Sequence, residues 1–248
     1  MDALRVLVVV AFVGLLVLLR LDAARFGAAE YDDETAPGGW RNAARRGAWY
    51  ALGLTLAAAI WLIHPLPVSV LHLHLGGDRL GAILAGLTLG ALGTAVAVLF
   101  AQARYRRLRF PEPRLYPGAM LNSIGTAVID EVAFRGALLG LLIAAGVPAD
   151  AAIALQAVLY GLATRLGAPG RSRVMLAVFL GLGLVTGAVT LATGGIGAAV
   201  LGHAITRMAF FVCTGHPGQV LPLGHEPEEE EAERLPPEGW QVVPEGDR

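Results

Sequence analysis

Cysteine, lysine and charge of either sign are scarce in this sequence, and each shortage excludes a class of protein. The 248 residues include one cysteine, Cys213, so the chain can form no internal disulfide. A zinc site with four cysteine ligands is excluded for the same reason. The 19 basic residues are all arginines and the net charge is −1, which leaves no basic surface of the kind that binds nucleic acid.

Apolar residues and glycine, by contrast, are abundant. Hydrophobic residues make up 55% of the chain and charged residues only 16%, and the mean hydropathy is +0.60. A soluble domain of this length is more polar and more highly charged. The 32 glycines fit a membrane protein, in which small residues let helices pack closely. The composition therefore predicts a protein whose main partner is the lipid bilayer.

Seven apolar stretches approach the ~20 residues that a membrane-spanning helix needs. We therefore predict an all-α fold, a polytopic integral membrane helix bundle with about seven transmembrane helices. The stretches are residues 3–19, 47–63, 80–101, 118–145, 149–166, 174–192 and 196–213.

Two of these stretches leave alternatives open. The first has the apolar run of a signal peptide, but Asp2 weakens the basic start and "RLDAARFGAAE" offers no clean cleavage site, which favours an uncleaved helix. The fourth would be roughly 40 Å long at 1.5 Å per residue, which is more than one span needs. We expect it to tilt, to kink, or to form two helices broken near Gly125 or Gly136.

The arginines between these stretches follow the rule that cytoplasmic loops are basic. Alternate connectors carry most of them, and the other three connectors hold only Arg79. This pattern predicts seven spans in a bacterial inner (plasma) membrane, with the N-terminus outside and the C-terminus in the cytoplasm. We divide the chain into N-terminal transmembrane helices with a basic connector (1–115), a helical core (116–213) and an acidic, Pro-rich tail (214–248) that is predicted to be disordered.

One connector, "HPLPVSVLHLHLGGD" at 64–78, alternates apolar and polar residues around His72 and His74. On a strand, residues two apart share one face, so the two imidazoles would be able to hold a metal ion together. No third ligand is evident apart from His64 or Asp78, and a surface loop lying on the membrane is the favoured interpretation. The sequence indicates no cofactor.

Five ionisable residues fall inside the apolar stretches, where such residues usually face the bundle interior and pair with one another. Glu131 and Arg135 are four apart with the acid first, the favourable order for a pair on one helix face. His203 and Arg207 are four apart on the last stretch. Asp130 points about 100° away from Glu131, and Arg207 is its predicted partner. The cluster is either an ion-pair contact between helices or a water-filled pocket for acid–base chemistry.

The stretch "DEVAFRG", residues 130–136, resembles the first motif of the CPBP intramembrane protease family. This family, also called Abi, contains CAAX prenyl endopeptidases and bacteriocin-processing enzymes. The segments "LQAVLYGLATRLG" and "TGGIGAAVLGHAITRMAFF" are similar to its second and third motifs. The resemblance covers about residues 118–211 and implies hydrolysis of a peptide bond at membrane depth.

The resemblance also implies roles for individual residues. The glutamate that activates water falls on Asp130, which is one methylene shorter. Its neighbouring glutamate falls on Glu131 and the arginine of the motif on Arg135, and both are kept. The oxyanion-binding histidine of the third motif falls on His203. The aromatic residue of the second motif falls on Tyr160.

Two catalytic positions of the family are replaced. The second-motif histidine falls on Thr164, which cannot act as a base near neutral pH, and the third-motif asparagine falls on Arg207. The sequence therefore favours a pseudoenzyme, meaning a hydrolase fold with reduced or lost peptidase activity. The alternatives are a non-catalytic scaffold or immunity-type partner for a transmembrane or lipidated peptide, and an active endopeptidase that uses Asp130 and Arg207. A small transporter is less favoured because no inverted repeat is visible.

Overall fold

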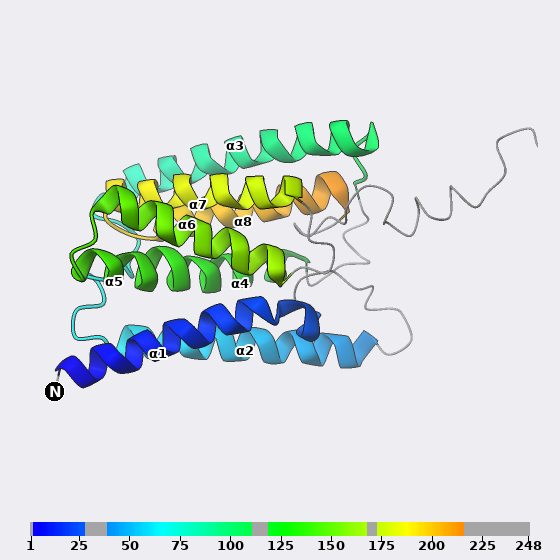
Figure 1. Ribbon diagram of the computed structural model, residues 1–248. Coiled ribbons are helices and arrows are strands. Elements are labelled where there is room, and N and C mark those ends of the chain that lie inside the picture. The colour runs from blue at the N-terminus through cyan, green and yellow to red at the C-terminus, as the bar shows by residue number, and fades with distance from the viewer. Residues whose placement is uncertain (1, 28–38, 111–118, 168–172, 216–248) are drawn as a thin grey trace, which may run out of the picture.

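The computed structural model describes residues 2–27, 39–110, 119–167 and 173–215, and it is a bundle of long helices (Figure 1). No strand occurs among these residues, and the predicted all-α membrane bundle is confirmed. The elements are α1 (Asp2–Leu21), η1 (Ala23–Phe26), α2 (Gly39–Ile63), α3 (Arg79–Tyr105), α4 (Ala119–Asp130), η3 (Glu131–Leu138), α5 (Leu139–Ala144), α6 (Ala149–Leu166), α7 (Arg173–Thr193) and α8 (Gly197–Thr214).

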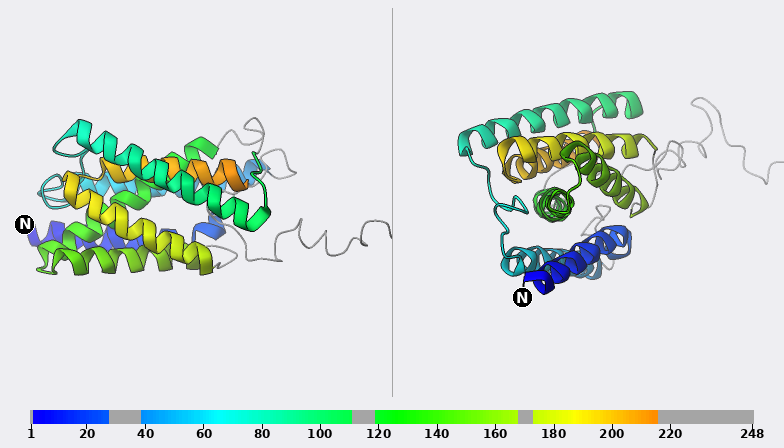
Figure 2. Two further views of the ribbon diagram at one scale, coloured as in Figure 1. Left: turned by 90° about the horizontal axis from the view of Figure 1, so that it is seen from above. Right: turned by 60° about the vertical axis from the view of Figure 1, so that its left-hand side comes forward.

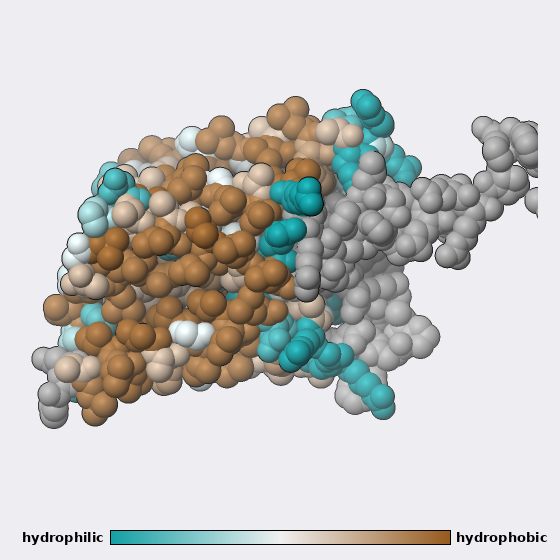
Figure 3. Space-filling model, in the orientation of Figure 1, coloured by the Kyte–Doolittle hydropathy of each residue, from teal (hydrophilic) through white to brown (hydrophobic). Residues whose placement is uncertain are grey.

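Five of the described helices, α1, α2, α3, α7 and α8, are long and apolar enough to cross a membrane. Large apolar side chains cover the bundle between its two ends, and polar side chains collect at the ends (Figure 3). Because burying apolar surface in lipid needs no second protein layer, many leucines on α1 and α3 stay exposed. The chain is an integral membrane protein.

The fourth apolar stretch is one continuous helix with a π-helical middle. α4 runs into η3, a π-helix, and η3 into α5, without leaving helical geometry at either junction (Asp130 φ −65°, ψ −43°; Leu139 φ −60°, ψ −47°). The option of two separate helices broken near Gly125 or Gly136 is therefore wrong. π-helical turns are rare and often mark functional sites, and this one begins at Glu131.

Part of the connector 64–78 is inserted into the end of the bundle, and the rest lies on its surface. Leu71 is fully buried and Leu73 nearly so, and glycines on the adjacent helix make room for them. A Cβ at Gly136 would stand 3.2 Å from the carbonyl oxygen of Leu71, and one at Gly140 would overlap that of Val70. The surface-loop interpretation is therefore wrong for Leu71 and Leu73, which belong to the core, whereas Leu66 and Leu75 stay exposed.

α3 and α8 form the most extensive helix pair, and glycines bring their backbones together. A Cβ on Gly90 would lie 2.7 Å from side-chain atoms of Ile205, and one on Gly93 would overlap Thr206. On α8, Gly202 faces the carbonyl oxygen of Gly86. This close approach explains much of the glycine content. α3 belongs to the predicted N-terminal part and α8 to the predicted core, and the three-part division stays a prediction.

Helix direction alternates along the chain, so the ends that carry most arginines meet at one side of the bundle. α1, α3, α6 and α8 end there, and α2, α4 and α7 begin there (Figure 1). The arginine-rich connectors therefore share one side of the bundle, as the rule for basic loops requires. Which side of the membrane this is stays a prediction. Of the predicted acidic tail (214–248), Thr214 is the last residue of α8, and residues 216–248 lie outside the described residues.

Replacing Gly90 with valine is expected to destabilise the bundle by about 1–3 kcal/mol, because the new methyl groups must push Ile205 and α8 away. The matched control is Gly181→Val on α7, since nothing lies within 4 Å of a Cβ there. Thermal unfolding in detergent measures the difference. Equal losses in the two variants would contradict the close α3–α8 contact.

The predicted orientation is testable in whole cells that carry a Cys213→Ser background. A cysteine at Gly77, which is exposed at the end where α3 begins, should react with a membrane-impermeant thiol reagent. A cysteine at Arg107, exposed at the opposite end, should react only after permeabilisation. The reverse pattern would place the N-terminus in the cytoplasm.

Candidate functional site

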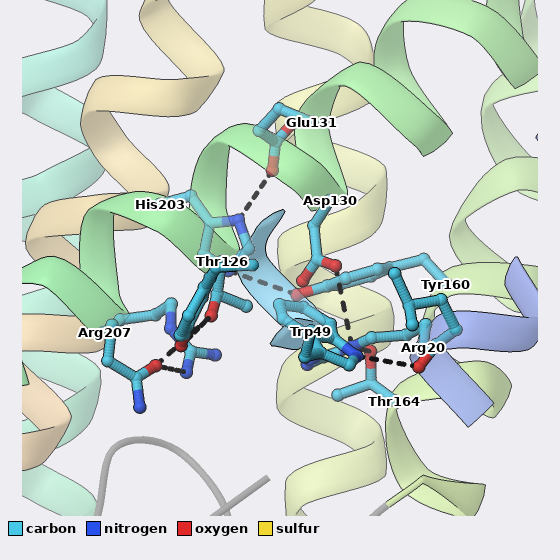
Figure 4. Close-up of polar contacts among 12 residues, drawn as sticks. Arg20, Trp49, Thr126, Asp130, Glu131, Tyr160, Thr164, His203 and Arg207 are labelled. Atoms are coloured by element: carbon cyan, nitrogen blue, oxygen red, sulfur yellow. Dashed lines mark hydrogen bonds and ion pairs between the residues drawn. The ribbon is translucent and has the colours of Figure 1, made fainter. Parts of the chain in front are cut away.

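Charged and polar side chains from four helices meet inside the bundle, and we call this set the polar cluster (Figure 4). Each member is at most 4% exposed, so all are removed from lipid and from bulk water. The three family-like motifs of the sequence supply most of the set, and α1 adds one residue. Its members are Arg20, Asp130, Glu131, Arg135, Tyr160, Thr164, His203 and Arg207.

Glu131 is the centre of the first half of the polar cluster. Its Oε1 lies 3.2 Å from Arg135 Nη1 and 2.7 Å from His203 Nδ1. The Tyr160 hydroxyl is 3.3 Å from His203 Nε2, and the Arg135 guanidinium stacks 4.0 Å above the Tyr160 ring centre. With Glu131 ionised, the fitting pattern is Tyr160 O–H donating to Nε2 and Nδ1–H donating to the carboxylate.

This half agrees with the sequence prediction. Glu131 and Arg135 do share a helix face, and the fourth and last helices do meet through Glu131 and His203. Opposite charges and hydrogen bonds at membrane depth compensate one another, because an unpaired buried charge costs several kcal/mol.

The predicted partner of Asp130 is wrong. Asp130 Oδ1 lies 3.6 Å from Nε of Arg20, at the end of α1. Arg207 Nη2 instead donates to Asn122 Oδ1 at 3.1 Å. Because Asp130 projects toward α1 and α6 while Asn122 lies more than two turns earlier on α4, the two arginines serve different neighbours.

Arg20 also contacts Thr164, the replacement for the second-motif histidine. The Arg20 Nε to Thr164 Oγ1 distance is 3.4 Å, so this nitrogen lies within 4 Å of both the acid and the replaced position (Figure 4). The end of α1 is held nearby by the Trp49 indole, which donates to the carbonyl oxygen of Leu19 at 2.9 Å. In the sequence, the one indication that Arg20 belongs to the site is its charge within "LLVLLRLDA". An arginine at this place is equally typical of the end of a membrane helix.

Arg207 belongs to a second small network that sequence reasoning missed. Thr126 Oγ1 also donates to Asn122 Oδ1 (3.2 Å), and the Tyr50 hydroxyl lies 3.2 Å from Thr126 Oγ1. This network connects α8 to α4 and α2, and in it Arg207 contacts an amide rather than an acid.

Metal binding by His72 and His74 lacks the expected geometry. The segment forms turns instead of a strand, and His72 has a left-handed φ of 52°. His72 Nδ1 lies 3.3 Å from the carbonyl oxygen of Gly194, and His74 Nδ1 accepts from the Gly76 N–H at 3.2 Å. The strand that would put the two imidazoles on one face is therefore wrong, and the described residues contain no group of three or more potential ligands.

Several buried atoms of the polar cluster have no hydrogen-bond partner among the described residues. They include Asp130 Oδ2, Glu131 Oε2 and both terminal nitrogens of Arg20, besides nitrogens of Arg135 and Arg207. Buried polar atoms in native proteins are normally satisfied by protein, water or ligand. The cluster therefore offers acceptors and donors to a polar group that enters it.

Residues 112–209 match the family described as type II CAAX prenyl endopeptidase Rce1-like. This membrane protein contains a CAAX-protease-like segment. The match spans η3, α6 and α7 entirely, together with nearly all of the polar cluster, and it confirms the resemblance that the motifs indicate. Arg20 lies outside the matched segment of this CAAX-protease-like chain. No curated protein and no solved structure matches the chain.

A double-mutant cycle distinguishes the two candidate partners of Asp130. Arg20→Leu and Asp130→Asn should each destabilise the protein, while the double variant should recover part of the loss, since contacting residues typically couple by about 0.5–3 kcal/mol. The same cycle with Arg207→Gln should be closer to additive. Unfolding in detergent measures both cycles. Stronger coupling to Arg207 than to Arg20 would contradict the described contacts.

Proposed function

We propose that this CAAX-protease-like protein binds a membrane peptide and hydrolyses it slowly or not at all. The observation that carries the proposal is the position of Arg20, whose Nε contacts both Asp130 and Thr164. The family resemblance implies that a carboxylate and a histidine activate water at these two positions. In this chain a guanidinium lies beside the two replacements.

A guanidinium is only a donor and a threonine hydroxyl is not a base near neutral pH. Neither side chain can therefore assist Asp130 in removing a proton from water. The loss of a positioned general base commonly lowers a rate by about 10²–10⁴-fold. The shorter Asp130 side chain and its ion pair with Arg20 further support weak water activation.

The oxyanion side of the family mechanism is altered as well. His203 already contacts Glu131 and Tyr160 through its two ring nitrogens. An active endopeptidase that uses Asp130 and Arg207 would need their side chains at one reacting centre, whereas Arg207 contacts Asn122. This geometry supports a retained scaffold more than a rebuilt active site.

The unpartnered atoms of the polar cluster support peptide binding. Asp130 Oδ2 and Glu131 Oε2 can accept from backbone N–H groups, and the terminal nitrogens of Arg20 can donate to a carbonyl oxygen. An exposed peptide backbone at membrane depth needs such partners. A transmembrane or lipidated peptide is the class of partner that fits, and the protein would act on it as a scaffold.

Restoring the family residues tests the proposal. The purified wild-type protein should retain a prenylated peptide on photo-crosslinking and cleave it slowly or not at all. Asp130→Glu, Thr164→His and Arg207→Asn combined with Arg20→Leu should raise cleavage by about 10²-fold or more, as measured by mass spectrometry of the products. The matched control keeps Arg20 in the triple variant and should stay inactive.

Melting temperatures check that both combined variants are folded. The proposal fails if the wild-type protein cleaves the peptide as fast as the restored variant does and Asp130→Ala and Glu131→Ala each abolish that cleavage. It also fails if the wild-type protein does not retain the peptide.

A further inference from the structure

A lateral groove of about 810 Å³ lies on the face of the bundle between α2 and α3. These two helices stand apart and are joined only by the 64–78 connector (Figure 2, right). α4, η3 and α8 form the floor of the groove, and Leu73, His74 and Leu75 of the connector line one end. The groove is open to the lipid side of the protein.

This groove is separate from the polar cluster, although both use the same helices. Val128 and Val132 line its floor, whereas Asp130 is two residues from each and projects from the opposite side of the helix, about 200° away. None of the polar cluster residues lines the groove. Its walls are almost entirely aliphatic, with Leu54, Ala82 and Leu201 among them.

The polar side chains that line the groove lie at one end. His74 can donate a hydrogen bond there, and Arg79 is a cation. Arg79, the first residue of α3, is exposed and has no acidic partner within ion-pair distance among the described residues. The neighbouring Asp78 uses its carboxylate to cap α3, accepting from the Leu80 N–H at 3.1 Å. His74 accepts from Gly76 at Nδ1, so its neutral form carries the proton on Nε2 and can donate there.

The depth of the groove fits a single leaflet. From Leu54 to the end of α2, and from the start of α8 to Ala204, the helix rise gives about 10–14 Å, close to half of the ~30 Å hydrocarbon core. Trp61 lines the groove near the end of α2 and is half exposed, as is typical of tryptophan at headgroup level. Arg79 and His74 lie at this same end.

We propose that the groove binds an anionic phospholipid, with one acyl chain along the floor and the phosphate held by Arg79 and His74. A guanidinium can donate two parallel hydrogen bonds to a phosphate. A lipid without a phosphate would leave these donors of Arg79 without an acceptor. An anionic headgroup fits better than a zwitterionic one because no ammonium group competes with Arg79. The site lies in the leaflet that contains the end of α2 and the start of α3.

Native mass spectrometry of the full-length protein tests this assignment with phosphatidylglycerol and phosphatidylcholine of identical acyl chains. The wild type should retain phosphatidylglycerol about tenfold more strongly, and Arg79→Gln should remove that preference, as expected for loss of charged hydrogen bonds. The matched control is Arg5→Gln, an exposed arginine at the same end on α1 that does not line the groove, and it should behave as the wild type.

A second variant, Ala58→Trp, places an indole in the groove and should reduce retention of both lipids while the melting temperature stays near that of the wild type. Equal retention of the two lipids by the wild type would overturn the proposal, as would equal effects of Arg79→Gln and Arg5→Gln. Displacement of phosphatidylglycerol by a farnesylated peptide would assign the groove to the lipid chain of a peptide instead. None of these results depends on whether the protein cleaves peptides.

Discussion

The structure depends on the neutralisation of two adjacent acids inside a lipid-embedded bundle. Asp130 and Glu131 are at most 1% exposed, and an isolated carboxylate at such a place would cost several kcal/mol. Adjacent residues on a helix project about 100° apart, so one neighbour cannot serve both acids. Each acid therefore recruits its own cation, Glu131 from within its own helix and Asp130 from α1.

This division of partners connects the N-terminal helix to the segment that carries the family motifs. Arg20 joins α1 to α4 and α6 through Asp130 and Thr164, and Trp49 of α2 fixes the end of α1. The CAAX-protease-like segment alone does not contain this contact. The replacement of a histidine by threonine and the presence of a buried arginine are thus two parts of one local change.

The apolar groove and the polar cluster use opposite faces of the same two helices. Asp130 of α4 contacts α1 and His203 of α8 contacts α6, whereas valines and alanines of α4, η3 and α8 line the groove between α2 and α3. The side that faces lipid therefore needs apolar residues, and the side that faces the polar cluster needs residues that compensate charge. The spacing of Ile124, Val128 and Val132, four residues apart, meets the first demand and leaves Asp130 and Glu131 to the second.

The sequence by itself determined the helices, because apolar length and hydropathy are local properties that lipid selects directly. It also determined the Glu131–Arg135 pair, whose spacing of four is a property of one helix, and the motif order that identifies the CAAX-protease-like core. Only the tertiary structure decided which arginine meets Asp130, since Arg20 and Arg207 carry the same charge and are separated by most of the chain. It also decided the π-helix at Glu131 and the burial of Leu71 and Leu73 in the 64–78 connector, because no local pattern records the packing between distant segments.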